Sequence, residues 1–323
     1  MLAPPNMTLG EAARKYIPAS RFNEGTPLTD ADYVRAAEVA IHQRDDGSSM
    51  ALASEAIRLN PKSAAAYYVR GRARYGGLAD GEKSSVDDLK RSIELGLGGP
   101  NTAGAWHCLA RAYDAQRDVP HAIEAIDEAI RLRPDDQAAY RTKAAILTAN
   151  NRKQEAIGAY TMALKLKPED AEMYFQRGQL FENLKQFNDA LKDYEGAISH
   201  GREGQQVPYK LMALKREASI FSQDKKFQKA VDVLSSAISM DNSDEELHRL
   251  RGEAYERLHK YAEAVADYSK AIEMAPDFSQ HSYEARARCY EKLGKVDLAA
   301  ADLKESKRLM DAPAEKPLYE LKQ

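Results

Sequence analysis

Residues 103–136 read AGAWHCLARAYDAQRDVPHAIEAIDEAIRLRPDD, and the adjoining residues 137–170 read QAAYRTKAAILTANNRKQEAIGAYTMALKLKPED. Both stretches have an aromatic residue at position 4, alanine at positions 8, 20 and 27, and proline at position 32. Agreement at a fixed period of 34 residues indicates a tandem repeat. The repeat, rather than any local segment, therefore decides the fold.

The same pattern, with substitutions, extends over most of the chain. It divides residues 30–313 into eight repeats: 30–63, 64–102, 103–136, 137–170, 171–204, 211–244, 245–278 and 280–313. An N-terminal segment, residues 1–29, and a C-terminal tail, residues 314–323, lie outside the repeats. In its period and in the residues at each position, the chain resembles the tetratricopeptide repeat (TPR) family.

The spacing of the recurring positions explains how such a repeat folds. Positions 4, 8 and 11, and again 20, 24 and 27, have the three- and four-residue spacing of one helix face. Small residues at positions 8 and 20 let the two helices of a repeat approach closely, and proline at position 32 cannot continue a helix. A single helix pair cannot bury its apolar face, so the repeats must stack. The sequence predicts an all-α fold of antiparallel helix pairs, and the resemblance implies a right-handed TPR helical-repeat solenoid.

Composition excludes several classes of protein. The chain has 47 Lys and Arg against 50 Asp and Glu, a net charge of −3, whereas nucleic-acid binders usually have a basic excess. We therefore expect no nucleic-acid partner. No stretch approaches 18 apolar residues, so we expect no transmembrane segment. The N-terminus lacks a signal-peptide pattern, which favours a cytoplasmic protein; the alternative is an exported protein whose signal peptide has been removed.

The sequence has no constellation of catalytic or cofactor-binding residues. Gly76–Ser84 approaches a phosphate-loop signature, but Glu82 separates the second glycine from Lys83, and a helix is predicted before it. The histidines lack the spacing of metal ligands. We expect Cys108 and Cys289 to be free thiols, packed or partly exposed. These observations predict a protein that is not an enzyme and has no cofactor and no metal site.

Two insertions interrupt the pattern, and two acidic pairs lie where one repeat meets the next. The glycine-rich stretch 76–84 lies inside repeat 64–102, and the link 201–210 precedes repeat 211–244. Both are expected to be loops, either tolerated surface insertions or functional loops. The pairs Asp135–Asp136 and Glu245–Glu246 fall at repeat junctions, where negative charge stabilises the start of the following helix.

The resemblance implies a concave surface lined by the first helix of each repeat, with positions 2, 5, 9, 12 and 13 facing into it. In the N-terminal half these positions combine arginine with aromatic rings, a composition typical of interaction hot spots and of carboxylate recognition. The candidate residues of a peptide-binding groove are Tyr68, Arg72, His107, Arg111, Arg141 and Phe175. From residue 245 onward the same positions alternate in sign, as in Arg249, Glu253, Glu256 and Arg257, which is typical of self-paired, solvated faces.

These observations together predict a function and an alternative. The co-chaperone type of TPR domain holds a C-terminal carboxylate with lysine and asparagine at set positions, and that pattern is absent here. We expect a non-enzymatic adaptor that binds a protein or peptide partner in the concave groove, with a preference for an acidic segment or a C-terminal carboxylate. The alternative is a self-associating structural scaffold, that is, a homo-oligomer.

Overall fold

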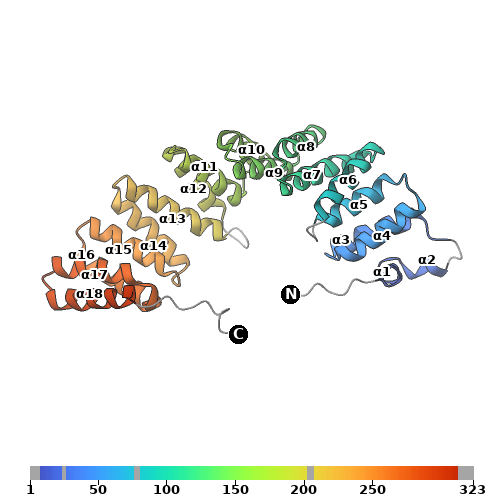
Figure 1. Cartoon of the computed structure of the whole chain (residues 1–323). Helices are drawn as coiled ribbons and strands as arrows, with labels where there is room; N and C mark the ends of the chain where they lie inside the picture. Colours follow the sequence, from blue (N-terminus) through green and yellow to red (C-terminus); the bar gives the residue numbers. More distant parts are fainter. Residues whose placement is uncertain (1–7, 24–26, 76–80, 202–206, 312–323) are drawn as a thin grey trace. The chain divides into compact units, whose positions relative to one another are not determined.

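The computed structural model describes residues 8–23, 27–75, 81–201 and 207–311 (Figure 1). All the regular elements within these ranges are helices, including one short 3-10 turn, η2 (Pro276–Phe278). The expected all-α class is therefore confirmed. Residues 76–80 and 202–206, which form much of the two insertions, lie outside the described ranges, so the nature of those loops stays a prediction.

Sixteen of the described helices form eight consecutive pairs, and the paired helices run antiparallel (Figure 1). The pairs are α3 (Asp30–His42) with α4 (Asp46–Leu59), α5 (Ala64–Tyr75) with α6 (Gly81–Glu94), α7 (Gly99–Ala115) with α8 (Val119–Leu132), α9 (Gln137–Ala149) with α10 (Lys153–Leu166), α11 (Ala171–Asn183) with α12 (Phe187–His200), α13 (Val207–Gln223) with α14 (Phe227–Met240), α15 (Glu245–Arg257) with α16 (Tyr261–Met274), and α17 (Gln280–Lys292) with α18 (Val296–Asp311). This is the helical-repeat arrangement that the sequence predicts.

The chain divides into two compact units. The N-terminal unit is Met1–Pro168 and contains α3 to α10, and the C-terminal unit is Glu169–Gln323 and contains α11 to α18. Each unit buries apolar clusters of its own, because every helix pair offers an apolar stripe that the next pair covers.

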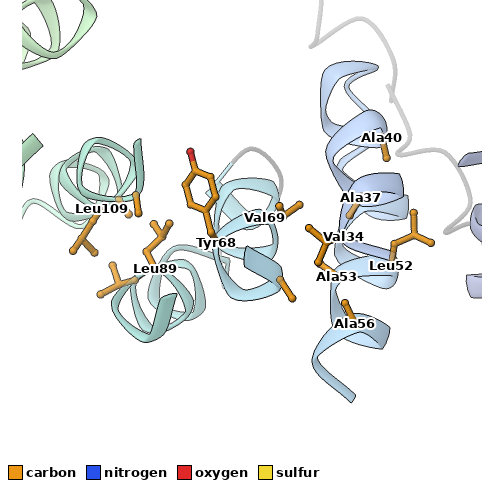
Figure 2. Packing of buried hydrophobic residues seen from close by; sticks show 14 of the residues in the cluster. Val34, Ala37, Ala40, Leu52, Ala53, Ala56, Tyr68, Val69, Leu89 and Leu109 are labelled. Carbon is orange, nitrogen blue, oxygen red and sulfur yellow. The ribbon is translucent and has the colours of Figure 1, made fainter. Parts of the chain in front are cut away.

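Alanine lines the helix crossings of the N-terminal unit. Ala37 on α3 and Ala53 on α4 are fully buried at the centre of their pair (Figure 2). Larger side chains such as Leu89 on α6 and Leu109 on α7 fill the space between pairs (Figure 2). Small residues at the crossings let the backbones approach, and the larger ones exclude voids, as close packing requires.

In two helix pairs of the C-terminal unit, glycine takes the place of alanine at position 8. A Cβ atom added to Gly252 on α15 would lie 2.9 Å from the ring of Tyr268 on α16, which is fully buried. Gly178 on α11 stands in the same relation to Tyr194 on α12, at 2.8 Å. The expected need for small residues at this position is confirmed, because the tyrosine ring occupies the volume of the missing side chain.

The N-terminal segment forms two further helices, α1 (Leu9–Tyr16) and α2 (Ala19–Asn23), and α1 packs against the first helix pair. Ala12 is fully buried, and the hydroxyl of Tyr16 donates a hydrogen bond to Asp45 across 2.7 Å. Arg21 on α2 donates to both carboxylate oxygens of Asp32, at 3.1 and 2.7 Å. The segment therefore covers apolar surface of α3 and α4, as a terminal cap of a repeat array must.

Acidic residues cap helices at the repeat junctions, as the sequence predicts. The Asp136 side chain accepts a hydrogen bond from the backbone N–H of Ala138 at 3.0 Å, at the start of α9. Glu245 and Glu246 occupy the first turn of α15. Each places negative charge beside backbone N–H groups that have no partner within the helix.

The turns inside the helix pairs, wherever the structure describes them, use the left-handed backbone conformation at one fixed position. Six residues other than glycine have φ between 58° and 60° there: Arg44, Arg117, Asn151, Lys185, Lys225 and His259. In the last pair, Gly294 occupies the same place with φ of 72°. Side chains other than glycine are disfavoured in this region, so these turns keep six of them at a conformational cost.

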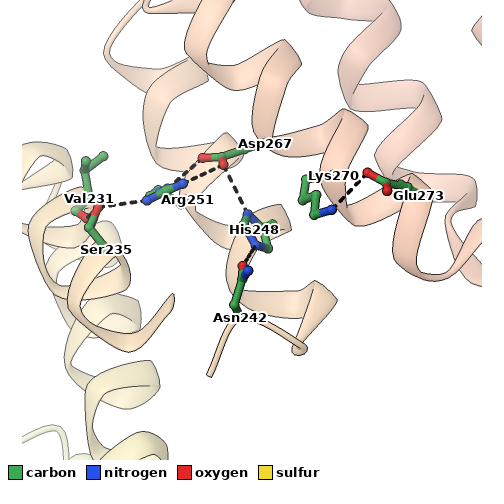
Figure 3. Close-up of polar contacts among 8 residues, drawn as sticks. All are labelled: Val231, Ser235, Asn242, His248, Arg251, Asp267, Lys270 and Glu273. Atoms are coloured by element: carbon green, nitrogen blue, oxygen red, sulfur yellow. Dashed lines mark hydrogen bonds and ion pairs between the residues drawn. The ribbon is translucent and has the colours of Figure 1, made fainter. Parts of the chain in front are cut away.

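A buried ion pair between arginine and aspartate recurs in four helix pairs, and the sequence reading missed it. Arg251 on α15 and Asp267 on α16 form one such pair, with His248 and Asn242 extending the network (Figure 3). The others are Arg70–Asp88, Arg177–Asp193 and Arg286–Asp302. In the C-terminal unit the two residues are always 16 apart, so arginine at position 7 with aspartate at position 23 is the signal that could have found them.

Candidate functional site

The predicted groove residues of the N-terminal unit lie on three successive first helices, α5, α7 and α9. On α5, the guanidinium carbon of Arg72 lies 5.3 Å from the centre of the Tyr68 ring. On α7, His107 shares a hydrogen bond between its Nε2 and Oγ1 of Thr142 on α9, at 2.8 Å. Adjacent helices of the predicted surface are thus in direct contact.

The three predicted arginines, Arg72, Arg111 and Arg141, influence the pKa values of two adjacent residues of α7, His107 and Cys108. Burial lowers the pKa of His107. The negative charge of Asp136 raises it, and the positive charges of Arg111, Arg133 and Arg141 lower it further. Because its pKa is lowered, the imidazole is neutral at pH 7, and the charge of this surface comes from the arginines.

The third arginine, Arg72, influences Cys108, which Arg111 influences as well. Burial raises the pKa of the Cys108 thiol, and the positive charges of Arg72 and Arg111 oppose that rise. The charge of Arg111 therefore acts on both His107 and Cys108, whereas Arg141 acts on His107 and Arg72 acts on Cys108. Arg111 and Arg141 are exposed. Cys108 is a free thiol, as expected, and Cys289 in the C-terminal unit is a second, fully buried one.

Two of the predicted groove residues are buried instead of exposed to a partner. Tyr68 is 7% exposed, because Gly104 on α7 leaves room for its hydroxyl. Phe175 is 4% exposed and packs against Tyr194 and Tyr209 in the C-terminal unit. Both rings are therefore covered by neighbouring helices, contrary to the expectation that they are exposed to a partner's side chains. Position 5 lies where the next first helix covers a large side chain.

Several charges of the C-terminal unit are paired, as the alternating signs predict. Arg249 forms ion pairs with Glu246 and Glu253, and Arg288 on α17 pairs with Glu256 on α15 at 3.1 Å. Arg257, which we expected to be self-paired as well, makes no ion pair with any residue in the part of the chain that the structure describes.

The C-terminal unit also contains two hollows that sequence reasoning missed. One, of about 420 Å³, lies between α13 and α15. The other, of about 930 Å³, extends from the turn after α13 to α17. They share Lys225, Phe227, Glu253 and Arg257, so they form one continuous depression, which we call the C-terminal hollow. No sequence motif predicts the C-terminal hollow. The basic residues at the ends of α13, α15 and α17 are the pattern from which it could have been predicted.

Features of other protein classes are absent from the described residues. Across residues 8–23, 27–75, 81–201 and 207–311, no cluster of three His, Cys, Asp or Glu side chains could hold a metal ion. In the same ranges, no helix combines the length and the apolar character needed to cross a membrane.

Comparison with known proteins agrees with the helix pairs. One family model described as tetratricopeptide repeat matches residues 109–171 and again 149–209, and a second with the same description matches residues 246–278. Residues 109–209 and 246–278 are therefore tetratricopeptide repeats. The TPR fold indicates a protein–protein interaction, and TPR proteins are generally non-enzymatic interaction modules. No curated protein matches the chain.

Several solved TPR structures are similar to parts of the chain at low identity. YrrB, a TPR protein with an unusual peptide-binding site, is 19% identical over 58% of this chain and 93% of its own, with a TM-score of 0.49. A tetratricopeptide repeat protein from Parabacteroides merdae is 18% identical over 75% and 93%, with a TM-score of 0.48. MamA from Desulfovibrio magneticus is 17% identical over 55% and 97%, with a TM-score of 0.47.

Proposed function

We propose that this TPR protein is a non-enzymatic adaptor that binds an acidic segment, or a C-terminal carboxylate, of a partner protein on the surface shared by Arg72, Arg111 and Arg141. The observation that carries the proposal is the position of Arg111, within electrostatic reach of both His107 and Cys108, which Arg141 and Arg72 respectively also influence. Guanidinium groups bind carboxylates with two parallel hydrogen bonds, which favours arginine at such sites.

The helices supply the geometry for this binding. α5, α7 and α9 are the first helices of consecutive pairs, which supports the inference that their arginines form a row across the helices. The hydrogen bond between His107 and Thr142 holds α7 against α9 and fixes the spacing within the row. A partner segment that lies across these helices would meet one positive charge on each.

The test is capture of a partner from the native source by the wild type and by the variant Arg111→Glu/Arg141→Glu. We expect the variant to lose the partner, and we expect wild-type binding to weaken with salt, because exposed charges are screened beyond roughly 8 Å at physiological ionic strength. The matched control is Arg131→Glu/Arg152→Glu, two exposed arginines of the same unit at the second helices α8 and α10. Equal loss in both variants, or in neither, contradicts the proposal.

A second candidate function, self-association, rests on the apolar face of α18. Val296, Leu303 and Met310 are 68%, 47% and 61% exposed, although the equivalent Leu234 and Tyr268 of the two preceding pairs are 1% and 0% exposed. Light scattering coupled to size-exclusion chromatography tests this candidate. A mass that rises with protein concentration and returns to the monomer value in Leu303→Glu would support it, and a constant monomer mass would reject it.

A further inference from the structure

The C-terminal hollow has an apolar floor. Where it lies between α13 and α15, it is lined by Ala218, Leu234, Leu250, Ala254 and Phe227. Ser219 and Ser222 stand at its side on α13. A depression with this floor and about 420 Å³ of space suits one apolar side chain, because small-molecule and side-chain pockets combine apolar walls with a few polar groups at the rim.

The rim carries positive charge that the protein does not neutralise itself. Lys225, Arg257 and Lys292 line the hollow, and none of them forms an ion pair within the described parts of the chain. Among the acidic residues of the rim, Glu253 is paired with Arg249 and Glu256 with Arg288. Glu291 is the one acidic residue of the rim without an ion pair among the described residues, so the positive charges are in excess.

The three cations come from three separate elements. Lys225 lies in the turn after α13, Arg257 ends α15, and Lys292 ends α17. The carbonyl groups at the ends of α15 and α17 favour a cation there, but a helix end carries a partial charge and does not cancel a full one. The charges are therefore spread along the larger part of the hollow, of about 930 Å³, and do not converge on a single point.

We propose that the C-terminal hollow is a second binding site, which takes an acidic segment of a partner protein: one apolar side chain enters the floor between α13 and α15, and the acidic side chains that follow it pair with Arg257, Lys292 and Lys225. A single terminal carboxylate would leave two of the three cations without a partner. A purely polar anion would leave the apolar floor in contact with water. An extended acidic segment with an apolar anchor satisfies both parts of the hollow.

The site is independent of the surface on α5, α7 and α9, and a defined probe can test it. The probe is a fluorescein-labelled peptide with an amidated C-terminus in which one leucine is followed by three glutamates. We expect the full-length protein to bind it with an affinity that falls as salt rises. No binding at millimolar protein concentration would overturn the proposal. So would equal binding of a peptide with glutamines in place of the glutamates and a free C-terminal carboxylate, because that result would indicate recognition of a chain end.

Variants then locate the site. Arg257→Gln/Lys292→Gln should bind the probe about tenfold more weakly, since each exposed charge pair is worth about two- to fivefold. Ser222→Phe, which fills the pocket from its side, should abolish binding while far-UV circular dichroism and the melting temperature stay near wild type. The matched control is Lys270→Gln on α16, which does not line the hollow and is paired with Glu273.

Two outcomes would place the probe elsewhere and overturn the proposal. One is an unchanged affinity in both Arg257→Gln/Lys292→Gln and Ser222→Phe. The other is a loss as large in Lys270→Gln as in the double variant. Arg111→Glu/Arg141→Glu should leave binding of the probe unchanged, so failure of this site and failure of the adaptor surface in the N-terminal unit are distinguishable.

Discussion

Arg251 on α15 donates hydrogen bonds to both carboxylate oxygens of Asp267 on α16, each at 2.8 Å, and a third to Ser235 on α14 at 3.0 Å. One guanidinium group thus joins the two helices of its own pair to the second helix of the preceding pair. Arg286 repeats the arrangement with Asp302 and Ser269. Because stacked pairs are stable mainly through their neighbours, these contacts connect the stability of one pair to that of the next.

Replacing Arg251 should therefore be strongly destabilising. Asp267 is 5% exposed, and Arg251→Ala would remove both guanidinium hydrogen bonds from its buried charge and leave His248 as its remaining partner. Breaking a buried ion pair in this way costs about 3–5 kcal/mol. Urea denaturation of the C-terminal unit, followed by circular dichroism, measures the change. The control is Arg249→Ala on the same helix, whose exposed pair with Glu253 should contribute less than about 1 kcal/mol. Equal effects of the two substitutions would contradict this account of Arg251.

Two glycines on helices should respond to alanine in opposite directions. At Gly252 the added methyl group would lie 2.9 Å from the buried ring of Tyr268, so Gly252→Ala should destabilise by about 1–3 kcal/mol through over-packing. At Gly158 on α10 no atom lies within 4 Å, so Gly158→Ala should stabilise by up to about 1 kcal/mol through helix propensity. Thermal unfolding of both variants checks the pair. A neutral Gly252→Ala would show that the tyrosine ring can move aside.

Acid should weaken the attachment of α1 through Asp45. Burial raises the pKa of this carboxyl, but hydrogen bonds from Tyr16, the backbone of Ser48, Lys15 and the Ser48 side chain outweigh it and lower the pKa from 3.8 to about 2. Because its pKa is lower in the folded state, the ionised Asp45 stabilises the folded protein above pH 3.8, and this stabilisation is lost as the pH falls toward 2. Urea denaturation at pH 5 and pH 2 measures this loss. Asp45→Asn, which keeps the helix cap, should lose less stability than the wild type over the same interval; an equal loss would contradict the assignment.

Both thiols should be unreactive in the folded protein. Burial and the negative charge of Glu256 raise the pKa of Cys289 to about 12, although the positive charge of Arg288 opposes the rise. Burial also raises the pKa of Cys108. The thiolate is the reacting species, so a disulfide reagent at pH 8 should modify both residues slowly in buffer and rapidly in urea. Fast modification of either thiol in buffer would show that it is a reactive group, against the non-enzymatic reading.

The left-handed turn position should favour glycine. Arg117 has φ of 59° and is exposed, and a left-handed residue other than glycine costs roughly 1–2 kcal/mol. Part of this gain is offset by the greater entropy of glycine in the unfolded chain. Arg117→Gly should therefore be more stable than Arg117→Ala by about 1 kcal/mol or less. Comparing the melting temperatures of the two variants removes the effect of the lost side chain; a less stable glycine variant would show that the turn is not strained.

The sequence was sufficient to predict the helix pairs because their packing depends on small residues at fixed spacing. Ala110 and Ala122 are both fully buried, at the positions where close helix approach requires them. Side-chain exposure on the first helices was harder to predict. Whether the ring at position 5 is exposed depends on the residue that faces it from the next first helix, such as Gly104 beside Tyr68. That contact joins residues a full repeat apart.

The candidate site was predictable only in part for a related reason. The alternating charges of Arg249 and Glu253 do pair along one helix, as spacing of four residues allows. Arg257 lies four residues after Glu253, but that carboxylate is already occupied by Arg249, which leaves Arg257 without an ion pair in the described chain. Competition between two arginines for one glutamate is settled by side-chain conformation, which residue spacing does not specify.

At two of the left-handed turns, the residue that would make the turn most stable differs from the residue that lines the C-terminal hollow. Lys225 and His259 hold this strained position, and both line the C-terminal hollow, whereas Gly294 holds it without strain and offers no side chain. Glycine in place of Lys225 or His259 would relieve the backbone but would also remove a side chain from the lining of the hollow. These two turns therefore cannot be made more stable in this way without changing the surface that we propose to bind a partner.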